Sequence, residues 1–212
     1  MQFVHDTKYS LLLTLMLGGL LFLTTLTVTG ADLNTGVLSG KIQLSSRIKG
    51  ENTLVYLEGV TGEFKTQKEP VEMGQENKVF IPHLLPLQKG QAVLFTNSDS
   101  FSHNVHPYWG RRSLFNIAQG IDGKHDWTPP RSGEYLVLCD IHREMSAFVF
   151  VFEHPLFASV DHRAGASEFK IQDIPEGTYT LVSVRDTKGK LKRQKQEVTI
   201  TAGQTTSVTI QF

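Results

Sequence analysis

The stretch SGEYLVLCDIHREMSAFVFVF, residues 132–152, decides the fold that we expect for this chain. Its segments EYLVLC and SAFVFVF are rich in β-branched and aromatic residues, which favour strands. Successive side chains of a strand point to opposite faces, so Tyr135, Val137 and Cys139 share one face of the first strand. The residues between the two segments form a tight loop that begins where this strand ends. Side chains of the loop can therefore converge with Cys139 on one site.

Cys139 is the only cysteine of the chain, and His142 and Met145 follow it at intervals of three residues. A single cysteine is most often a buried, inert thiol, but an inert thiol leaves this spacing unexplained. Zinc prefers closed sets of Cys and His ligands, and a thioether is a poor ligand for it. Two histidines, one cysteine and a weak axial methionine form a blue-copper electron-transfer site, in which sulfur suits Cu(I) and imidazole accepts Cu(II). The loop therefore predicts a copper site that needs one more histidine.

The second histidine is expected from the segment FTNSDSFSHNVH, residues 95–106. A predicted strand ends within this segment and leads into a loop that carries His103, the better candidate. His106 is the competing candidate, although a histidine at such a place is more often a surface or partly buried side chain. His83 and His125 lie in turn-like sequence, and we expect both to be exposed.

The chain after its first thirty residues has the pattern of β-structure throughout. Short β-branched and aromatic runs alternate with Gly, Pro, Asn, Asp and Lys turns, and no sustained helical period interrupts them. This regular spacing is typical of sandwiches and barrels. The run KGKLKRQK, residues 188–195, is expected to form a solvated hairpin tip and edge, because lysines discourage edge-to-edge pairing. We expect strands over residues 36–44, 53–60, 78–82, 91–97, 134–139, 146–152, 168–174, 178–186, 196–202 and 206–212.

Composition and motifs narrow the class of protein. The length of 212 residues suits one or two domains with a buried core. The 21 Lys and Arg balance the 21 Asp and Glu, so the formal net charge of zero gives no argument for a nucleic-acid partner or a charged membrane surface. The sequence has no nucleophile elbow, metalloprotease motif, phosphate loop or haem-attachment motif. We therefore expect a protein that is not an enzyme and that binds no nucleic acid.

The N-terminal segment has the pattern of a secretory signal peptide. Lys8 precedes an apolar run over residues 11–28, and the small residues TGA follow at 29–31. The alternative is a membrane anchor, because the run is nearly long enough to span a bilayer. Its glycines and threonines weaken the hydrophobicity, so we expect residues 1–31 to be cleaved and the mature protein to be periplasmic or secreted. Association with a membrane is expected only if the segment stays uncleaved.

The block over residues 68–153 resembles the cupredoxins, and especially the plastocyanin- and amicyanin-like blue-copper domains. The similarity lies in KVFIPHLLPLQKGQAVLFTNSDSFSHNV, with its F-x-P segment and H-N-V motif, and in SGEYLVLCDIHREM, with its G-x-Y-x-x-x-C-x-x-H-x-x-M loop. The resemblance implies a Greek-key β-sandwich that holds one type 1 copper. It also implies that Asn104 links the two ligand loops by hydrogen bonds. The implied copper ligands are His103, Cys139, His142 and Met145.

The flanking residues 32–67 and 154–212 resemble the transthyretin-like or carboxypeptidase-regulatory-like β-sandwich. The similarity lies in FASVDHRAGASEFKIQDIPEGTYTLVSVRD, where Pro175 and Gly177 set a tight turn between two strands. The whole chain is thus similar to exported proteins that are named methylamine-utilisation-like or plastocyanin-like. We expect an all-β protein in which the cupredoxin domain, residues 68–153, is inserted into a second, smaller and discontinuous β-sandwich.

The resemblance implies an exported type 1 (blue) copper protein that carries single electrons between redox partners, with an unidentified redox protein as its partner. The alternative is a copper-binding module for trafficking, sensing or storage, and a third possibility is a structural protein with an incidental site. A storage protein usually shows many Met and His ligands, whereas this chain has four Met and eight His that only partly cluster. We expect His142 to bring an imidazole edge to the surface, beside a charged rim of Arg143 and Glu144.

Overall fold

The computed structural model describes residues 34–44, 52–187 and 189–212, which all belong to one compact unit. The expected signal peptide, residues 1–31, lies outside the described residues. The described residues form strands and one short 3-10 turn, η1 (His162–Ala164), which confirms the all-β class. No helix among them is long and apolar enough to cross a membrane. In chain order the strands are β1 (Thr35–Gln43), β2 (Asn52–Glu58), β3 (Val71–Glu76), β4 (Val79–Ile81), β5 (Leu84–Gln88), β6 (Val93–Asn97), β7 (His103–Trp109), β8 (Arg112–Ser113), β9 (Ile117–Gln119), β10 (Lys124–Trp127), β11 (Gly133–Leu138), β12 (Ser146–Phe152), β13 (Phe157–Asp161), β14 (Glu168–Pro175), β15 (Gly177–Asp186), β16 (Leu191–Ile200) and β17 (Thr205–Gln211).

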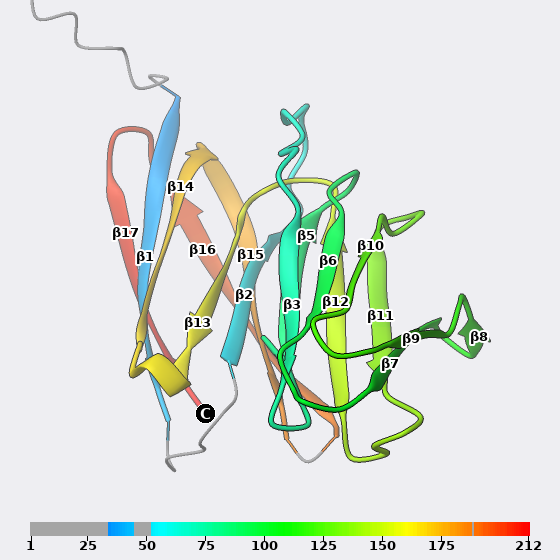
Figure 1. Cartoon of the computed structure of the whole chain (residues 1–212). Coiled ribbons are helices and arrows are strands. Elements are labelled where there is room, and N and C mark those ends of the chain that lie inside the picture. The colour runs from blue at the N-terminus through cyan, green and yellow to red at the C-terminus, as the bar shows by residue number, and fades with distance from the viewer. Residues whose placement is uncertain (1–33, 45–51, 188) are drawn as a thin grey trace, which may run out of the picture. The chain divides into compact units, whose positions relative to one another are not determined.

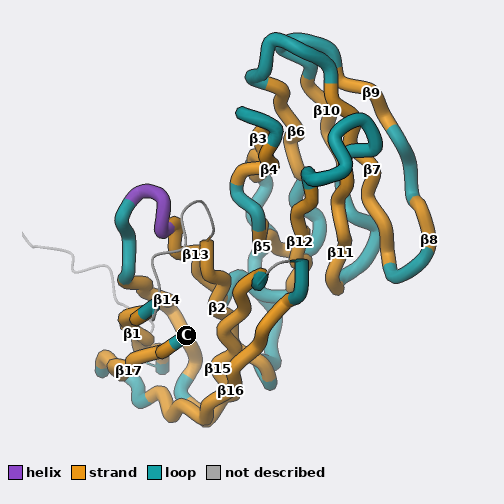
Figure 2. Tube along the Cα trace, turned by 90° about the horizontal axis from the view of Figure 1, so that it is seen from below, coloured by secondary structure: helices purple, strands orange, loops and turns teal. Residues whose placement is uncertain are grey.

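The strands form four sheets (Figure 1). Sheet 1 has the order β14-β1-β17, and sheet 2 has the order β13-β2-β15-β16. Sheet 3 has the order β5-β12-β11-β7-β8, with β9 also paired to β7, and sheet 4 has the order β10-β6-β3-β4. Figure 2 shows β5, β12, β11 and β7 running side by side in sheet 3, the sheet on which the Cys139 loop is built.

Sheets 3 and 4 enclose the core that holds Cys139. Strand β11 alternates as the sequence predicts, with Tyr135 and Val137 fully buried and Glu134, Leu136 and Leu138 partly or fully exposed. Phe80 and Phe95 of sheet 4 belong to the same buried cluster. Cys139 is part of this cluster, so the thiol lies at the end of an apolar core and is shielded from water.

Strand β2 is buried on both faces, which explains its uninterrupted apolar sequence. Val55 and Leu57 belong to a core with residues of sheet 1, whereas Leu54 and Tyr56 belong to a cluster that includes Phe150 of β12. Sheet 2 therefore shares one core with sheet 1 and another with sheet 3. A strand covered on both faces loses the alternation of polar and apolar residues that a half-exposed strand shows.

The N-terminal strands pair with strands from the C-terminal part of the chain. Strand β1 is antiparallel to β14 and parallel to β17, and β2 is antiparallel to β13 and β15. These pairings are the ones that an inserted domain requires. The boundaries of the discontinuous sandwich and of the inserted domain, residues 68–153, stay a prediction.

The strand positions correct one expectation and agree with another. His103 was expected on a loop, but it is the first residue of β7, whose Pro107 obscured the strand pattern. Proline is tolerated here because Pro107 lies between the part of β7 that pairs with β9 and the part that pairs with β8. The Lys-rich run agrees with its expectation, because the described residues 191–195 belong to β16, an exposed edge strand of sheet 2 that forms a hairpin with β15.

Candidate metal centre

Three potential ligands meet at one end of sheet 3. His103 begins β7, Cys139 directly follows β11, and His142 lies in the loop that leads to β12. The Cys139 Sγ lies 3.8 Å from His103 Nδ1 and 3.9 Å from His142 Nδ1, and the two Nδ1 atoms are 3.0 Å apart. Among the described residues, this is the group of His, Cys and carboxylate side chains whose spacing suits a metal ion.

The triangle formed by these three atoms has the size that a metal ion requires. A triangle with sides of 3.0, 3.8 and 3.9 Å has a point that is about 2.1 Å from each corner. Metal–nitrogen bonds of about 2.0 Å and metal–sulfur bonds of about 2.3 Å are usual in proteins. The donor set of two imidazoles and one thiolate thus fits a copper ion without rearrangement of the loop.

Met145 closes the ligand loop from within the core. Its side chain is buried and belongs to the same apolar cluster as Cys139. Its backbone N–H donates to the His142 carbonyl at 2.9 Å, and its carbonyl accepts from the Cys139 N–H at 3.3 Å. These bonds fold residues 139–145 into one tight turn. The structure thus brings together the Nδ1 and Sγ atoms of three expected ligands and places the Met145 side chain in the same buried cluster as Cys139.

Asn104 links the two strands that carry the ligands. Its Oδ1 accepts from the backbone N–H of Asp140 at 2.7 Å and of Ile141 at 3.2 Å. The same oxygen lies 3.3 Å from Cys139 Sγ, where it accepts from the thiol. Its Nδ2 donates to Asn116 Oδ1 at 2.6 Å. Asn104 therefore holds the first turn of the ligand loop against β7, the position that the cupredoxin resemblance implies for it.

The other three histidines considered from the sequence lie outside the triangle. His106 bonds to Asp140 Oδ2 through Nδ1, at 2.9 Å, and to Ser113 Oγ through Nε2, at 2.8 Å. His83 and His125 were expected to be exposed, and this is wrong. The His83 ring is 2.8 Å from Asp186 and mostly buried, because it lies where β5 approaches sheet 2. The half-buried His125 ring packs edge-on against Phe115, since β10 pairs with β6 as part of sheet 4.

Asp99 is a functional candidate that the sequence analysis missed. Its Oδ2 lies 2.8 Å from His103 Nε2, the ring nitrogen that faces away from the donor triangle. Burial alone would raise the pKa of the Asp99 carboxyl, but the backbone N–H of Lys78, the His103 ring and the N–H of Asn77 together hold that pKa below its usual value. The signal in the sequence is the spacing of four residues between Asp99 and His103, after an Asn-x-Asp turn.

The two histidines differ in their access to solvent. His103 is fully buried, whereas His142 is partly exposed. The ring of Phe101 lies edge-on to both, at 5.2 Å from the His103 ring and 5.4 Å from the His142 ring, and is 38% exposed. Ile141 is 54% exposed, and the charged residues Arg143 and Glu144 next to His142 are exposed as well. The surface around His142 is therefore partly apolar and carries both signs of charge.

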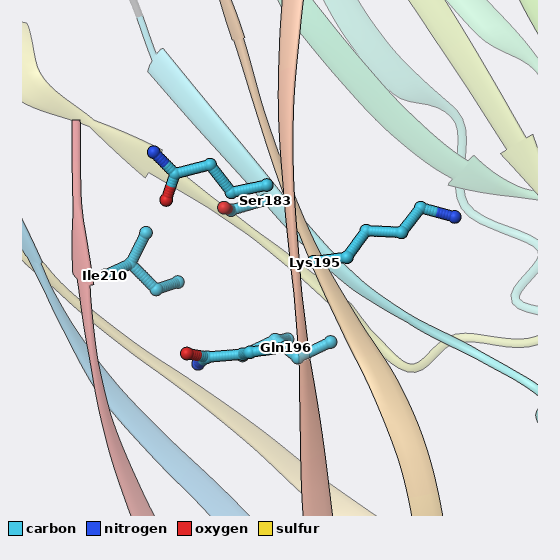
Figure 3. A pocket seen from close by; sticks show the side chains of 6 residues that line it. Ser183, Lys195, Gln196 and Ile210 are labelled. Carbon is cyan, nitrogen blue, oxygen red and sulfur yellow. The ribbon is translucent and has the colours of Figure 1, made fainter.

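A small cavity between strands of sheets 1 and 2 is not a competing site. Figure 3 shows its lining, to which β15 contributes Ser183, β16 contributes Lys195 and Gln196, and β17 contributes Ile210. Its volume of about 40 Å³ holds two or three water molecules. This volume is far below the roughly 300–1,000 Å³ that is typical of pockets for small organic ligands.

Comparison with known proteins gives neither a matching family model nor a matching curated protein. Among solved structures, a reduced amicyanin mutant is 21% identical, with a TM-score of 0.37, over 39% of this chain and 81% of that one. Amicyanin from Paracoccus versutus is 22% identical, with a TM-score of 0.36, over 39% of this chain and 80% of that one. A purple cupredoxin from Nitrosopumilus maritimus is 20% identical, with a TM-score of 0.36, over 39% of this chain and 99% of that one. Because these TM-scores are below 0.5, the case for a metal centre rests on the donor atoms of this chain.

Proposed function

We propose that this protein is an exported blue-copper electron carrier that holds one type 1 copper per chain. The observation that carries this proposal is the triangle of His103 Nδ1, Cys139 Sγ and His142 Nδ1, whose centre is about 2.1 Å from each atom. Met145, buried in the same cluster as Cys139, supplies the weak axial thioether that completes the ligand set. The partner is a redox protein, and the compartment is the periplasm or the cell exterior.

The residues of the site hold one geometry for both oxidation states. A bound copper ion would supply a one-electron couple between Cu(II) and Cu(I), with soft sulfur and imidazole as ligands acceptable to both. His103 is fixed within β7, and Asn104 ties the start of the loop to the same strand. The backbone N–H of His142 donates to Cys139 Sγ at 3.4 Å, which stabilises the thiolate. A site that is anchored in this way changes little when an electron enters or leaves.

The exposed part of His142 gives the electron its route to a partner. The buried His103 offers no edge to solvent, whereas His142 is partly exposed, contacts the exposed Phe101 ring and is followed by the exposed Arg143 and Glu144. A reduced partner gives one electron through this edge, and an oxidised partner then takes it away. Charges at the rim of such a contact mainly change the association rate and its salt dependence.

The test is the visible spectrum of the exported protein, loaded with copper and recorded in oxidised and reduced states. The wild type should show an intense visible band that disappears on reduction, and Cys139→Ser should lack this band because the thiolate–copper bond produces it. His106→Ala is the matched control for His103→Ala, because the two side chains lie on one strand and only His103 belongs to the triangle. The control should keep the band, and His103→Ala should lose it.

Two results separate the proposal from its rivals. An unchanged spectrum in Cys139→Ser removes the blue-copper assignment. If the coloured protein, once reduced, resists oxidation by small inorganic reagents for hours, it stores its copper and does not exchange electrons through it. In that case the protein is a copper-binding module for trafficking or storage, and the electron-carrier function is rejected.

A further inference from the structure

Asp99 contacts the buried ligand histidine from the side opposite the donor triangle. The His103 ring is completely buried, with Nδ1 directed at Cys139 and His142 and with Nε2 at 2.8 Å from Asp99 Oδ2. The Asp99 side chain is only 8% exposed. The pair is therefore a carboxylate–imidazole contact that is shielded from water, where a hydrogen bond to an ionised group is stronger than one at the surface.

The neighbouring backbone keeps this carboxylate in place. Asp99 Oδ1 accepts from the Asn77 N–H at 2.7 Å, and Oδ2 accepts from the Lys78 N–H at 3.0 Å. These two residues form the turn between β3 and β4 and have positive φ angles of 54° and 59°. The Asp99 N–H in turn donates to Asn97 Oδ1 at 3.0 Å. The position of Asp99 is thus fixed from two sides before His103 is considered.

We propose that Asp99 is a positioning residue that keeps His103 in the tautomer with a proton on Nε2 and so presents the Nδ1 lone pair to the metal. The proposal rests on the proposed function of the site. Which nitrogen of a ligand histidine carries the proton is set by the hydrogen bond of the other nitrogen. A carboxylate can only accept, so Nε2 must donate to Asp99 and Nδ1 remains free as a ligand.

The charge of Asp99 also favours the oxidised ion. A carboxylate hydrogen-bonded to a ligand imidazole makes that imidazole a stronger donor, which benefits Cu(II) more than Cu(I). Loss of such a partner typically lowers metal affinity by about 10- to 100-fold. If the affinity for Cu(II) falls by a factor that is ten times larger than the factor for Cu(I), the reduction potential rises by about 59 mV.

The alternative role for Asp99 is purely structural, as an anchor for the turn at Asn77 and Lys78. Asp186 provides a control for this role, because its Oδ2 lies 2.8 Å from His83 Nε2 and its side chain is 6% exposed. The Asp99 and Asp186 pairs thus match in distance and burial, but only the first touches a proposed ligand. Both Asp99→Asn and Asp186→Asn should lower the stability of the protein, and only Asp99→Asn should change the metal site.

The experiment has a copper-free and a copper-loaded part. Long-range proton–nitrogen NMR spectra of the copper-free wild type, at mildly alkaline pH, should show His103 with a slowly exchanging proton on Nε2 and none on Nδ1. In the copper-loaded protein, Asp99→Asn should keep the visible band and raise the reduction potential. The rise should be about 59 mV for each tenfold fall in the affinity for Cu(II) relative to that for Cu(I). Asp186→Asn should leave the potential at the wild-type value.

A proton on His103 Nδ1 in the copper-free wild type overturns the proposal, and this measurement needs no variant to fold. An unchanged potential in Asp99→Asn, or an equal shift in Asp186→Asn, shows that Asp99 only anchors the turn and also overturns it. A wild type that binds no copper defeats the proposed function instead. In that case the NMR spectrum of the copper-free protein still decides how Asp99 orients His103.

Discussion

Asn104→Ala should loosen the ligand loop more than it harms the rest of the protein. Besides its weak bond from the Cys139 thiol, the wild-type amide makes three bonds that the variant lacks, to the N–H of Asp140, the N–H of Ile141 and the side chain of Asn116. A hydrogen bond contributes about 1 kcal/mol net, so the free energy of unfolding should fall by about 3 kcal/mol. The two freed N–H groups belong to the turn that carries Cys139 and His142, so the donor triangle should lose its fixed geometry as well.

Asn52→Ala is the matched control for this prediction. Asn52 is buried like Asn104 and also makes three bonds, to the N–H and carbonyl of Leu84 and to Ser159 Oγ. Its removal should lower the free energy of unfolding by a similar amount, about 3 kcal/mol. These bonds join β2 to β5 and β13 and contact none of the proposed ligands, so copper binding should be unchanged.

The assay measures stability and copper affinity separately. Denaturant unfolding of the copper-free proteins gives the loss of stability, and copper titration followed by the visible band gives the affinity. Asn104→Ala should bind copper about 10- to 100-fold more weakly than the wild type, as is typical when a group supporting a metal ligand is removed. Wild-type affinity and spectrum in Asn104→Ala, or an equal loss of affinity in Asn52→Ala, would refute the reasoning.

Four further predictions follow from the sequence and the fold. Met145→Leu should keep copper but raise the reduction potential, measured by redox titration, because loss of a donor disfavours Cu(II) more than Cu(I); a lowered potential contradicts this. Arg143→Glu should change the salt dependence of electron exchange with charged inorganic oxidants and leave the visible spectrum intact, and equal rates at all ionic strengths count against it. Phe150→Ala, in the cluster shared by sheets 2 and 3, should cost about 3–5 kcal/mol in denaturant unfolding, and a loss below about 1 kcal/mol would show that the cluster contributes little. N-terminal sequencing of the exported protein should show that the mature chain begins near Ala31 or Asp32, whereas an uncleaved chain in the membrane fraction identifies an anchor.

The part of the candidate metal centre that lies within residues 139–145 was predictable, because it depends on short spacings in the sequence. Cys139, His142 and Met145 lie on one turn, and the alternation of β11 already directs Cys139 into the core. Most of the strands with strong apolar patterns were likewise predicted within a few residues. The strand β5 was missed because of Pro86, which is tolerated since β5 is an edge strand of sheet 3.

Interactions between distant segments were not predictable in the same way. Asp99 meets the turn at Asn77 and Lys78 only because β3 and β6 pair in parallel, and no local pattern reports this pairing. His83 meets Asp186 only because sheet 2 packs against sheet 3. In both cases the sequence shows a polar residue in a turn-like context, and exposure is the ordinary expectation for such a residue.

The preference for His103 over His106, which the sequence already favoured, has its physical reason in the register of β7 and β11. In this antiparallel pair, Val137 lies opposite Pro107 and Leu138 lies opposite His106. Directly opposed residues share a face, and residues two apart on one strand share it as well. The face of Val137 and Cys139 therefore includes His103, whereas His106 lies on the other face with Leu138. One register thus brings the thiol and the imidazole together across 36 residues of sequence, and a shift by a single residue would have placed His106 in the core instead.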